Sequence, residues 1–205
     1  AKIIQSEIVG LSLGAEAISS GFTSFAIALL IVLLFMVFYY QTAGMAASLA
    51  LVLNILFIFG VLASLGAVLS LPGIAGIVLT IGMAVDANVL IYERVREELK
   101  MGKGLSLAIS DGYKHAYAAI IDANVTTLLT GIILYTFGTG PIKGFATTLI
   151  IGIVTSLFAA IFLTRLVFEA KMAKKKSIKF SSKLTEGLFT NSSFAFIANR
   201  KRAYI

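Results

Sequence analysis

Apolar residues along the chain form five long blocks, and short polar stretches separate them. A helix needs about 20 mostly apolar residues to cross the hydrocarbon core of a bilayer, and it satisfies its own backbone groups there. The five predicted spans are Phe22–Tyr40, Met45–Leu65, Leu71–Tyr92, Ala116–Phe137 and Phe145–Phe168. The pattern therefore predicts an all-α membrane protein, a polytopic bundle of transmembrane helices.

The composition supports a membrane protein and gives no sign of an enzyme. Of the 205 residues, 59% are apolar and 13% are charged, and the mean hydropathy is +0.97. Soluble domains are about half apolar and about a quarter charged. The absence of cysteine excludes disulfides and thiolate metal sites. The sequence contains no phosphate loop, nucleophile elbow or zinc motif, so we expect neither catalysis nor a cofactor.

The net charge of +7 comes from Lys and Arg in two connections and a tail, and not from a folded basic face. This placement argues against nucleic-acid binding and is typical of the loops that set membrane topology. The basic residues after the third span are Arg94, Arg96, Lys100, Lys103 and Lys114, and those after the fifth are Lys171, Lys174, Lys175, Lys176, Lys179 and Lys183. The opposite connections carry only Lys143, with Lys2 at the start. By the positive-inside rule, the chain begins in the periplasm and ends in the cytoplasm of a bacterial inner-membrane protein.

This topology divides the chain into segments. Residues 1–21 form a periplasmic lead-in, and residues 22–168 form the five-helix domain with a cytoplasmic loop at 93–114. A basic cytoplasmic linker covers residues 169–193. In residues 194–205 a basic cluster precedes a new apolar start, which predicts the beginning of a further span on the cytoplasmic side.

The loop at 93–114 has its own predicted structure. The third span continues as a helix with Arg94 and Glu98 paired at i,i+4, and it stops near Gly102. Apolar residues then recur at helical spacing from Leu105 to Tyr113, which predicts a short helix along the membrane surface.

Two aspartates lie inside predicted spans, Asp86 in the third and Asp122 in the fourth. Each costs at least about 2.5 kcal/mol at the centre of a membrane, so intramembrane acids usually have a function. Each begins an Asp-Ala-Asn-Val repeat, and the two helices run in opposite directions. Both acids lie about 10 Å from the cytoplasmic edge, given 1.5 Å of rise per residue. We therefore expect them to face each other or a shared polar cavity.

Carboxyls in such a place are candidates for proton transfer, because surrounding hydrocarbon favours their neutral form and changing water access lets the proton come and go. Asn88, Asn124 and Thr126 are candidate members of the proton path through hydrogen bonds, with Thr126 at i+4 from Asp122. The alternative is that these polar groups only hold helices together.

Three other polar side chains are weaker candidates. Arg165 is expected to pair with Glu169 at i,i+4, with a counter-charge to an intramembrane aspartate as its alternative role. Asn54 is expected to form an interhelical hydrogen bond. His115, the only histidine, has no neighbouring ligand in the sequence, so we expect no metal site.

Long stretches of the sequence resemble the SecD family, a branch of the resistance-nodulation-division (RND) transporter superfamily. Three segments carry the resemblance: VGLSLGAEAI at 9–18, LPGIAGIVLTIGMAVDANVLIYERVREEL at 71–99 and DANVTTLLTGIILYTFGTGPIKGFATTLIIGIVTSLFAAIFLTR at 122–165. A shorter likeness at 194–205 is to the start of the partner SecF half. The resemblance covers about residues 9–168.

The resemblance implies an accessory subunit of Sec protein export that uses the proton-motive force to assist preprotein translocation. Its implied partners are a SecF half or subunit, the SecYEG translocon with SecA, the translocating preprotein, protons and membrane lipid. In this family Asp86 corresponds to the leading proton-carrying acid and Asp122 to the accompanying one. Two alternatives stay open: another RND-type proton-coupled exporter of lipids or small molecules, and a structural scaffold without proton flux.

Overall fold

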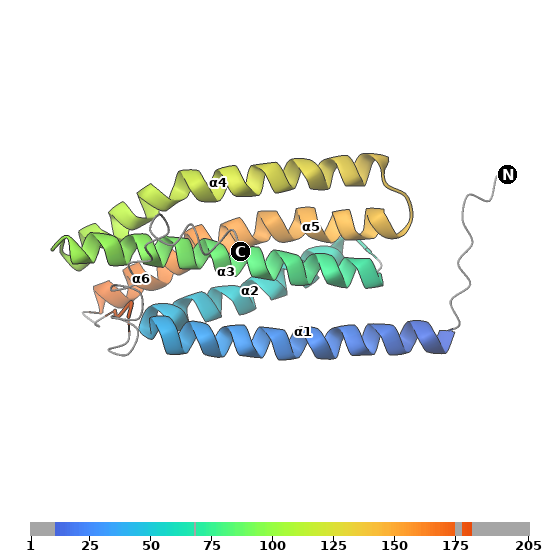
Figure 1. The fold of residues 1–205 in the computed structure, drawn as a ribbon, viewed down its shortest axis with the longest axis horizontal. Helices are drawn as coiled ribbons and strands as arrows, with labels where there is room; N and C mark the ends of the chain where they lie inside the picture. Colours follow the sequence, from blue (N-terminus) through green and yellow to red (C-terminus); the bar gives the residue numbers. More distant parts are fainter. Residues whose placement is uncertain (1–10, 68, 175–177, 182–205) are drawn as a thin grey trace, which may run out of the picture.

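A computed structural model of the chain describes residues 11–67, 69–174 and 178–181, and in these it forms a bundle of long helices (Figure 1). Five of them are long and apolar enough to cross a membrane, as predicted. The elements are α1 Leu11–Tyr40, α2 Thr42–Ser64, α3 Leu71–Lys100, α4 Leu105–Phe137, α5 Pro141–Phe158, the π-helical turn η1 Ala159–Leu163 and α6 Thr164–Ala173. The last three run on without a break as the fifth spanning segment.

Helix α3 has the clearest local signals and matches its prediction at both ends. The Ser70 hydroxyl accepts a hydrogen bond from the Gly73 N–H at 3.3 Å, and Pro72 occupies the first turn. The helix continues past the predicted span to Lys100. Gly102 follows with a φ of 85°, a left-handed conformation that glycine adopts without a Cβ clash.

The helices differ from the predicted elements at two places. Helix α1 begins at Leu11, so residues 11–21 of the expected lead-in are already helical. The separate surface helix after Leu105 does not form, because α4 is one continuous helix to Phe137. Its apolar face at Ala108, Ile109 and neighbouring residues is buried in the bundle core and does not lie on a surface.

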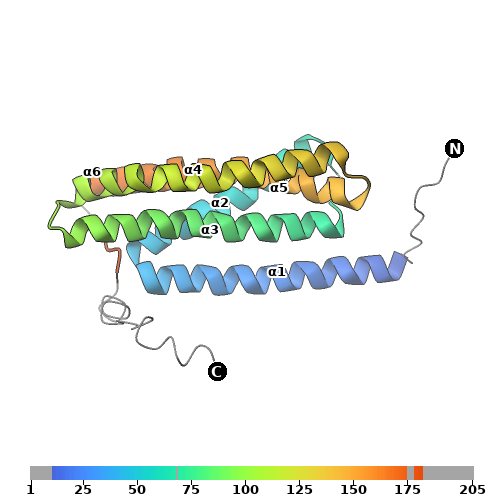
Figure 2. The same ribbon diagram turned by 45° about the horizontal axis from the view of Figure 1, so that its top comes forward.

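Helix α3 lies in the middle of the bundle and packs on both α5 and α4 (Figures 1 and 2). Small residues allow these close approaches. A Cβ on Gly76 would meet the Thr148 side chain of α5, and one on Gly112 of α4 would meet Val95 of α3. The α3–α4 pair is therefore held at close range at its Lys100–Leu105 end.

The α1–α2 turn is a second point of close packing, and the chain after α6 returns to it. Gln41 makes the turn with a φ of 51°. The Thr42 hydroxyl and the Ala43 N–H both donate to the Lys179 carbonyl, each at 3.1 Å. Phe180 is 3% exposed and its ring packs on Tyr92. This part of the predicted basic linker is thus docked on the bundle, whereas the predicted further span at 194–205 lies outside the described residues.

The α1–α2 turn gives a stability prediction. A Cβ on Gly44 of α2 would collide with the backbone carbonyl of Met36, whereas one on Gly60 of the same helix meets nothing within 4 Å. Backbone cannot move aside as a side chain does, so we expect Gly44→Ala to destabilise the fold by about 1–3 kcal/mol. Thermal unfolding in detergent of the full-length protein that contains this chain tests this.

Gly60→Ala is the matched control and should not lower the melting temperature, because alanine is the better helix former. Equal melting temperatures for the two variants would contradict the close approach at Gly44.

Candidate functional site

A cavity of about 410 Å³ lies between α3 and α4 at the level of Asp86. Its walls are mostly apolar, and among the lining residues only Asp86 and Glu93 are acidic. Helix α3 contributes Met83, Asp86, Ala87, Val89, Leu90 and Glu93, and α4 contributes Ala119, Ile120, Ala123, Asn124 and Thr127. The spacing of three, four and seven residues is that of one helix face on each side.

Asp86 is exposed at the mouth of this cavity. Within the described part of the chain its carboxyl has no hydrogen-bond or ion-pair partner. A carboxyl so far inside an apolar span is costly. It is therefore the strongest functional candidate among the predicted site residues.

Asp122 does not share the cavity with Asp86, which corrects the expectation that the two acids face each other or one polar cavity. Asp122 is exposed and does not line the cavity, whereas Asn124 of the same repeat does. Two residues along a helix correspond to a rotation of about 200°, so Asp122 and Asn124 lie on nearly opposite faces of α4. Equal depth in the membrane brings two residues to one level but does not turn them toward each other.

Of the predicted hydrogen-bonding residues Asn88, Asn124 and Thr126, only Asn124 lines the cavity. Asn124 Nδ2 donates to the Ile120 carbonyl at 2.8 Å, and Asn88, 2% exposed, donates to the Ala84 carbonyl at 3.0 Å. Thr126 is exposed and its hydroxyl donates to the Ala123 carbonyl at 2.9 Å, and not to Asp122. Thr127, missed by the sequence reasoning, lines the cavity; its position at i+3 from Asn124 was the signal.

Asn54 of α2 differs from its prediction. Its side chain is fully buried, and within the described residues neither Oδ1 nor Nδ2 has a hydrogen-bond partner. The expected interhelical hydrogen bond is therefore not formed.

Glu93 is a second functional candidate that the sequence reasoning missed. It lies seven residues, or two turns, after Asp86 on the same face of α3. Glu93 Oε1 accepts hydrogen bonds from the Tyr40 hydroxyl of α1 at 2.9 Å and from Arg96 Nη1 at 2.6 Å. Arg96 is 9% exposed, and its guanidinium also lies over the Tyr39 ring, 5.5 Å from the centroid. The i+7 spacing from Asp86 was the available signal.

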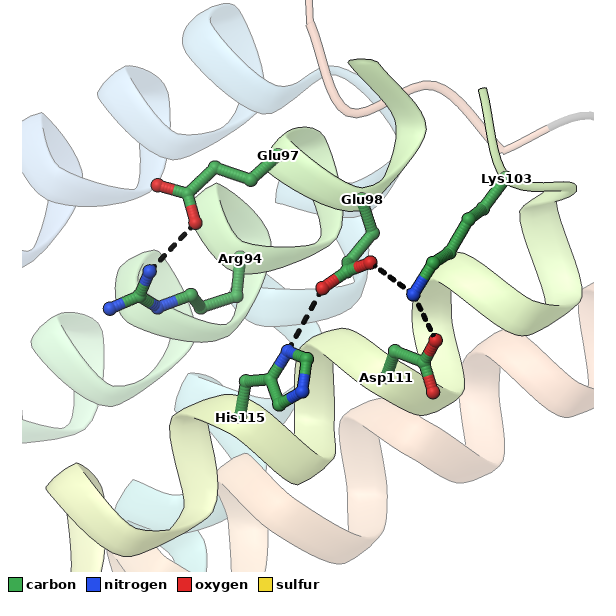
Figure 3. A network of polar contacts seen from close by, with 6 residues as sticks. All are labelled: Arg94, Glu97, Glu98, Lys103, Asp111 and His115. Atoms are coloured by element: carbon green, nitrogen blue, oxygen red, sulfur yellow. Dashed lines mark hydrogen bonds and ion pairs between the residues drawn. The ribbon is translucent and has the colours of Figure 1, made fainter. Parts of the chain in front are cut away.

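A polar network closes the α3–α4 pair at its connection (Figure 3). Glu98, whose side chain is 5% exposed, accepts a hydrogen bond from His115 Nδ1 at 2.9 Å and forms an ion pair with Lys103 Nζ at 2.6 Å. Lys103 also donates a hydrogen bond to Asp111, and this bond, followed by the contact with Glu98, raises the pKa of the Lys103 ammonium group. A raised lysine pKa means that its contribution to stability is present below the ordinary value and is lost only as pH rises through the raised one. Lys103 is therefore fully protonated around neutral pH, and its contacts in the network are intact there.

This network also corrects a predicted ion pair. Arg94 pairs with Glu97 at 2.7 Å, at i,i+3, and not with Glu98 (Figure 3). Glu98 lies on the buried side of α3 and takes its partners from the loop and from α4.

Arg165 pairs with Glu169 at 3.0 Å, as predicted, and both side chains are more than half exposed. It lies just after η1, at the rim of a second cavity of about 350 Å³ that Lys114 and Tyr117 of α4 also line. Its ion pair is with Glu169 and with neither aspartate. Within the described residues, no group of three His, Asp or Glu side chains could hold a metal ion.

Comparisons with known proteins agree on one family. Residues 1–175 match the family described as protein export membrane protein SecD/SecF, C-terminal. The protein translocase subunit SecD of Rhodothermus marinus is 59% identical over 174 residues, 85% of this chain and 28% of that protein. SecD of Magnetococcus marinus is 52% identical over 177 residues, 86% of this chain and 34% of that protein. The chain thus spans about a third or less of the length of these relatives.

Solved structures give the same answer. The crystal structure of SecDF from Thermus thermophilus, described as a translocon-associated membrane protein, matches with a TM-score of 0.85 and 38% identity over 95% of this chain and 26% of that chain. SecDF in its super-membrane-facing form matches with a TM-score of 0.81 and 39% identity, over 93% of this chain and 25% of that chain. Together with the five apolar helices, these relatives indicate a multi-pass protein of the inner membrane.

The network at the α3–α4 connection gives a second stability prediction. Glu98→Gln removes the buried anion between Lys103 and His115, so we expect the melting temperature of the full-length protein to fall by several degrees. Glu97→Gln makes the same change one position earlier, where the side chain is 57% exposed, and should alter the melting temperature little. Equal effects of the two variants would show that burial of Glu98 does not matter for stability.

Proposed function

This chain belongs to the SecD/SecF family of protein-export membrane proteins, and from that premise we propose that it works in a proton-driven accessory subunit of Sec protein export. In this role it assists translocation of preproteins across the inner membrane. The relatives are named protein translocase subunits, which favours transport over catalysis.

One observation carries the proposal: Asp86 places an unpaired carboxyl at a cavity inside an apolar helix pair. A carboxyl that serves only to hold helices together needs a partner across the interface. Asp86 has none within the described residues, and it lies beside a volume large enough for several water molecules at about 30 Å³ each. These are the conditions for a group that takes up and releases a proton.

The other predicted proton-path residues receive different roles. Asn124 and Thr127 supply polar groups to the wall opposite Asp86, and Asn88 supports α3 from its buried face. Asp122 and Thr126 lie on the exposed face of α4, where Asp122 is a second proton-binding acid and Thr126 is a polar neighbour on the next turn. Arg165 is the candidate counter-charge if α4 and α6 move, since its present pair with Glu169 is exposed and weak.

The proposed partners follow from the family. They are a SecF half or subunit, the SecYEG translocon with SecA, the translocating preprotein, protons and membrane lipid. The exposed apolar side chains of α1, among them Ile31, Leu34 and Phe38, fit contact with lipid or with a further span. The alternative of an RND-type exporter of lipids or small molecules has no specific observation in its favour.

The proposed orientation places the α3–α4 connection and the chain after α6 in the cytoplasm, because both carry clustered Lys and Arg. Ser106→Cys and Thr139→Cys test it, since these exposed positions lie near opposite ends of α4. In intact cells, an impermeant thiol reagent should label the cysteine at position 139 and not the one at 106. Labelling at 106 before permeabilisation would reverse the topology.

Asp86→Asn tests the proposed function. The change is nearly isosteric and keeps hydrogen-bonding capacity, but it removes the titratable proton. We expect the variant to insert normally while the stimulation of preprotein export by a proton gradient falls to the level without a gradient. The measurement is export of a preprotein into vesicles with and without the gradient, at matched membrane levels of the full-length protein.

Asp122→Asn is the comparison variant. It should reduce gradient-dependent stimulation less than Asp86→Asn does, because Asp122 does not line the cavity. Full stimulation in Asp86→Asn would leave the proposed function without its central residue.

A further inference from the structure

Glu93 connects the cavity of Asp86 to a helix that does not line it. Glu93 lies in the cavity wall, and its Oε1 accepts from Tyr40 of α1 and from Arg96. Arg96 in turn contacts Tyr39 of α1 through a hydrogen bond of 3.4 Å and through the ring face. One carboxylate therefore borders the cavity on one side and the end of α1 on the other.

We propose that Glu93 is a second proton-binding carboxyl, whose protonation loosens the end of α1 and so couples the cavity to the movement of that helix. This inference rests on the proposed function, because the proton comes from Asp86. The proton leaves the Asp86 carboxyl and binds the Glu93 carboxylate, so Asp86 becomes charged as Glu93 becomes neutral. The two groups are seven residues apart, about 10 Å along the helix, so the transfer runs through water in the cavity.

The partners of Glu93 make its charge important for packing. Hydrogen bonds to an ionised acceptor are roughly twice as strong as those between neutral groups, so neutral Glu93 holds Tyr40 and Arg96 less firmly. Arg96 would then be a nearly buried cation without its anion, which is strongly destabilising. The facing ionisable groups are Asp86 and Arg96 on α3 and the two tyrosines on α1. The α4 residues that line the cavity carry no charge.

Helix α1 depends on this end for its attachment. Among its described side chains, only Met36 and Tyr40 are buried, and both lie in its last two turns, where Tyr40 donates a hydrogen bond to Glu93. Figures 1 and 2 show α1 along one edge of the bundle, with α2 leaving it at an angle from their shared turn. Weakening of the Glu93 hydrogen bonds therefore affects the end of α1 that carries its buried side chains.

The experiment uses the full-length protein in membrane vesicles with Met36→Cys as a reporter, since Met36 is 1% exposed. The rate of labelling by a thiol reagent measures release of the α1 end. In the otherwise unchanged protein, a proton gradient should raise this rate severalfold. Glu93→Gln imitates the neutral carboxyl, so labelling should be fast with or without the gradient, and gradient-dependent export should be lost. Glu93→Asp keeps a carboxyl and should retain part of both responses.

Two controls separate a specific role from a general loss of structure. Glu97→Gln changes an exposed carboxyl one turn further along α3, outside the cavity, and should retain both responses. Tyr40→Phe removes a donor to Glu93 without changing any carboxyl, and should raise labelling in the absence of a gradient.

Comparison of the single and double variants tests whether the proton passes from Asp86 to Glu93. Asp86→Asn should keep labelling slow under both conditions, and the double variant with Glu93→Gln should label as fast as Glu93→Gln alone. If Glu93→Gln behaves like Glu97→Gln while Asp86→Asn loses export stimulation, the inference about Glu93 fails and the proposed function stands. If Asp86→Asn keeps full stimulation, the proposed function itself fails.

Discussion

The close approach of α3 and α4 at Gly112 and Val95 is the contact on which the candidate site depends. It brings the two helices together at one end, and the Glu98–Lys103–His115 contacts secure that end. Further along the pair, a cavity lies between the two helices beside Asp86. A bulkier residue at Gly112 would change the spacing of the whole pair, because packed interiors transmit such changes.

The spans could be predicted from the sequence because hydrocarbon imposes a single requirement on every residue of a spanning helix. Long apolar runs satisfy it, and Gly102 marked the end of α3 by its conformational preference. The start of α1 and the continuity of α4 were missed. In both places the helix continues through residues more polar than those of a spanning segment, so the hydropathy pattern does not mark its true extent.

The sequence predicted how deep in the membrane the site residues lie, but not which way their side chains face. Counting residues from the membrane edge placed Asp86 and Asp122 at one level, yet facing depends on the rotation of each helix about its axis. In the two Asp-Ala-Asn repeats, α3 turns its aspartate to the cavity and α4 turns its asparagine. The π-helical turn at Ala159–Leu163 left no signal in the sequence, and neither did the lack of a hydrogen-bond partner for Asn54 among the described residues, since neither follows from local preference.

The segment after α6 has a mechanical consequence. Its backbone is hydrogen-bonded to Thr42 and Ala43, and Phe180 is inserted among the core aromatic rings. A tension applied to the chain beyond Ser181 therefore enters the bundle at the α1–α2 turn and not at the end of α6. Because Gln41 of this turn joins α1 to α2, such a tension acts directly on the connection between these two helices.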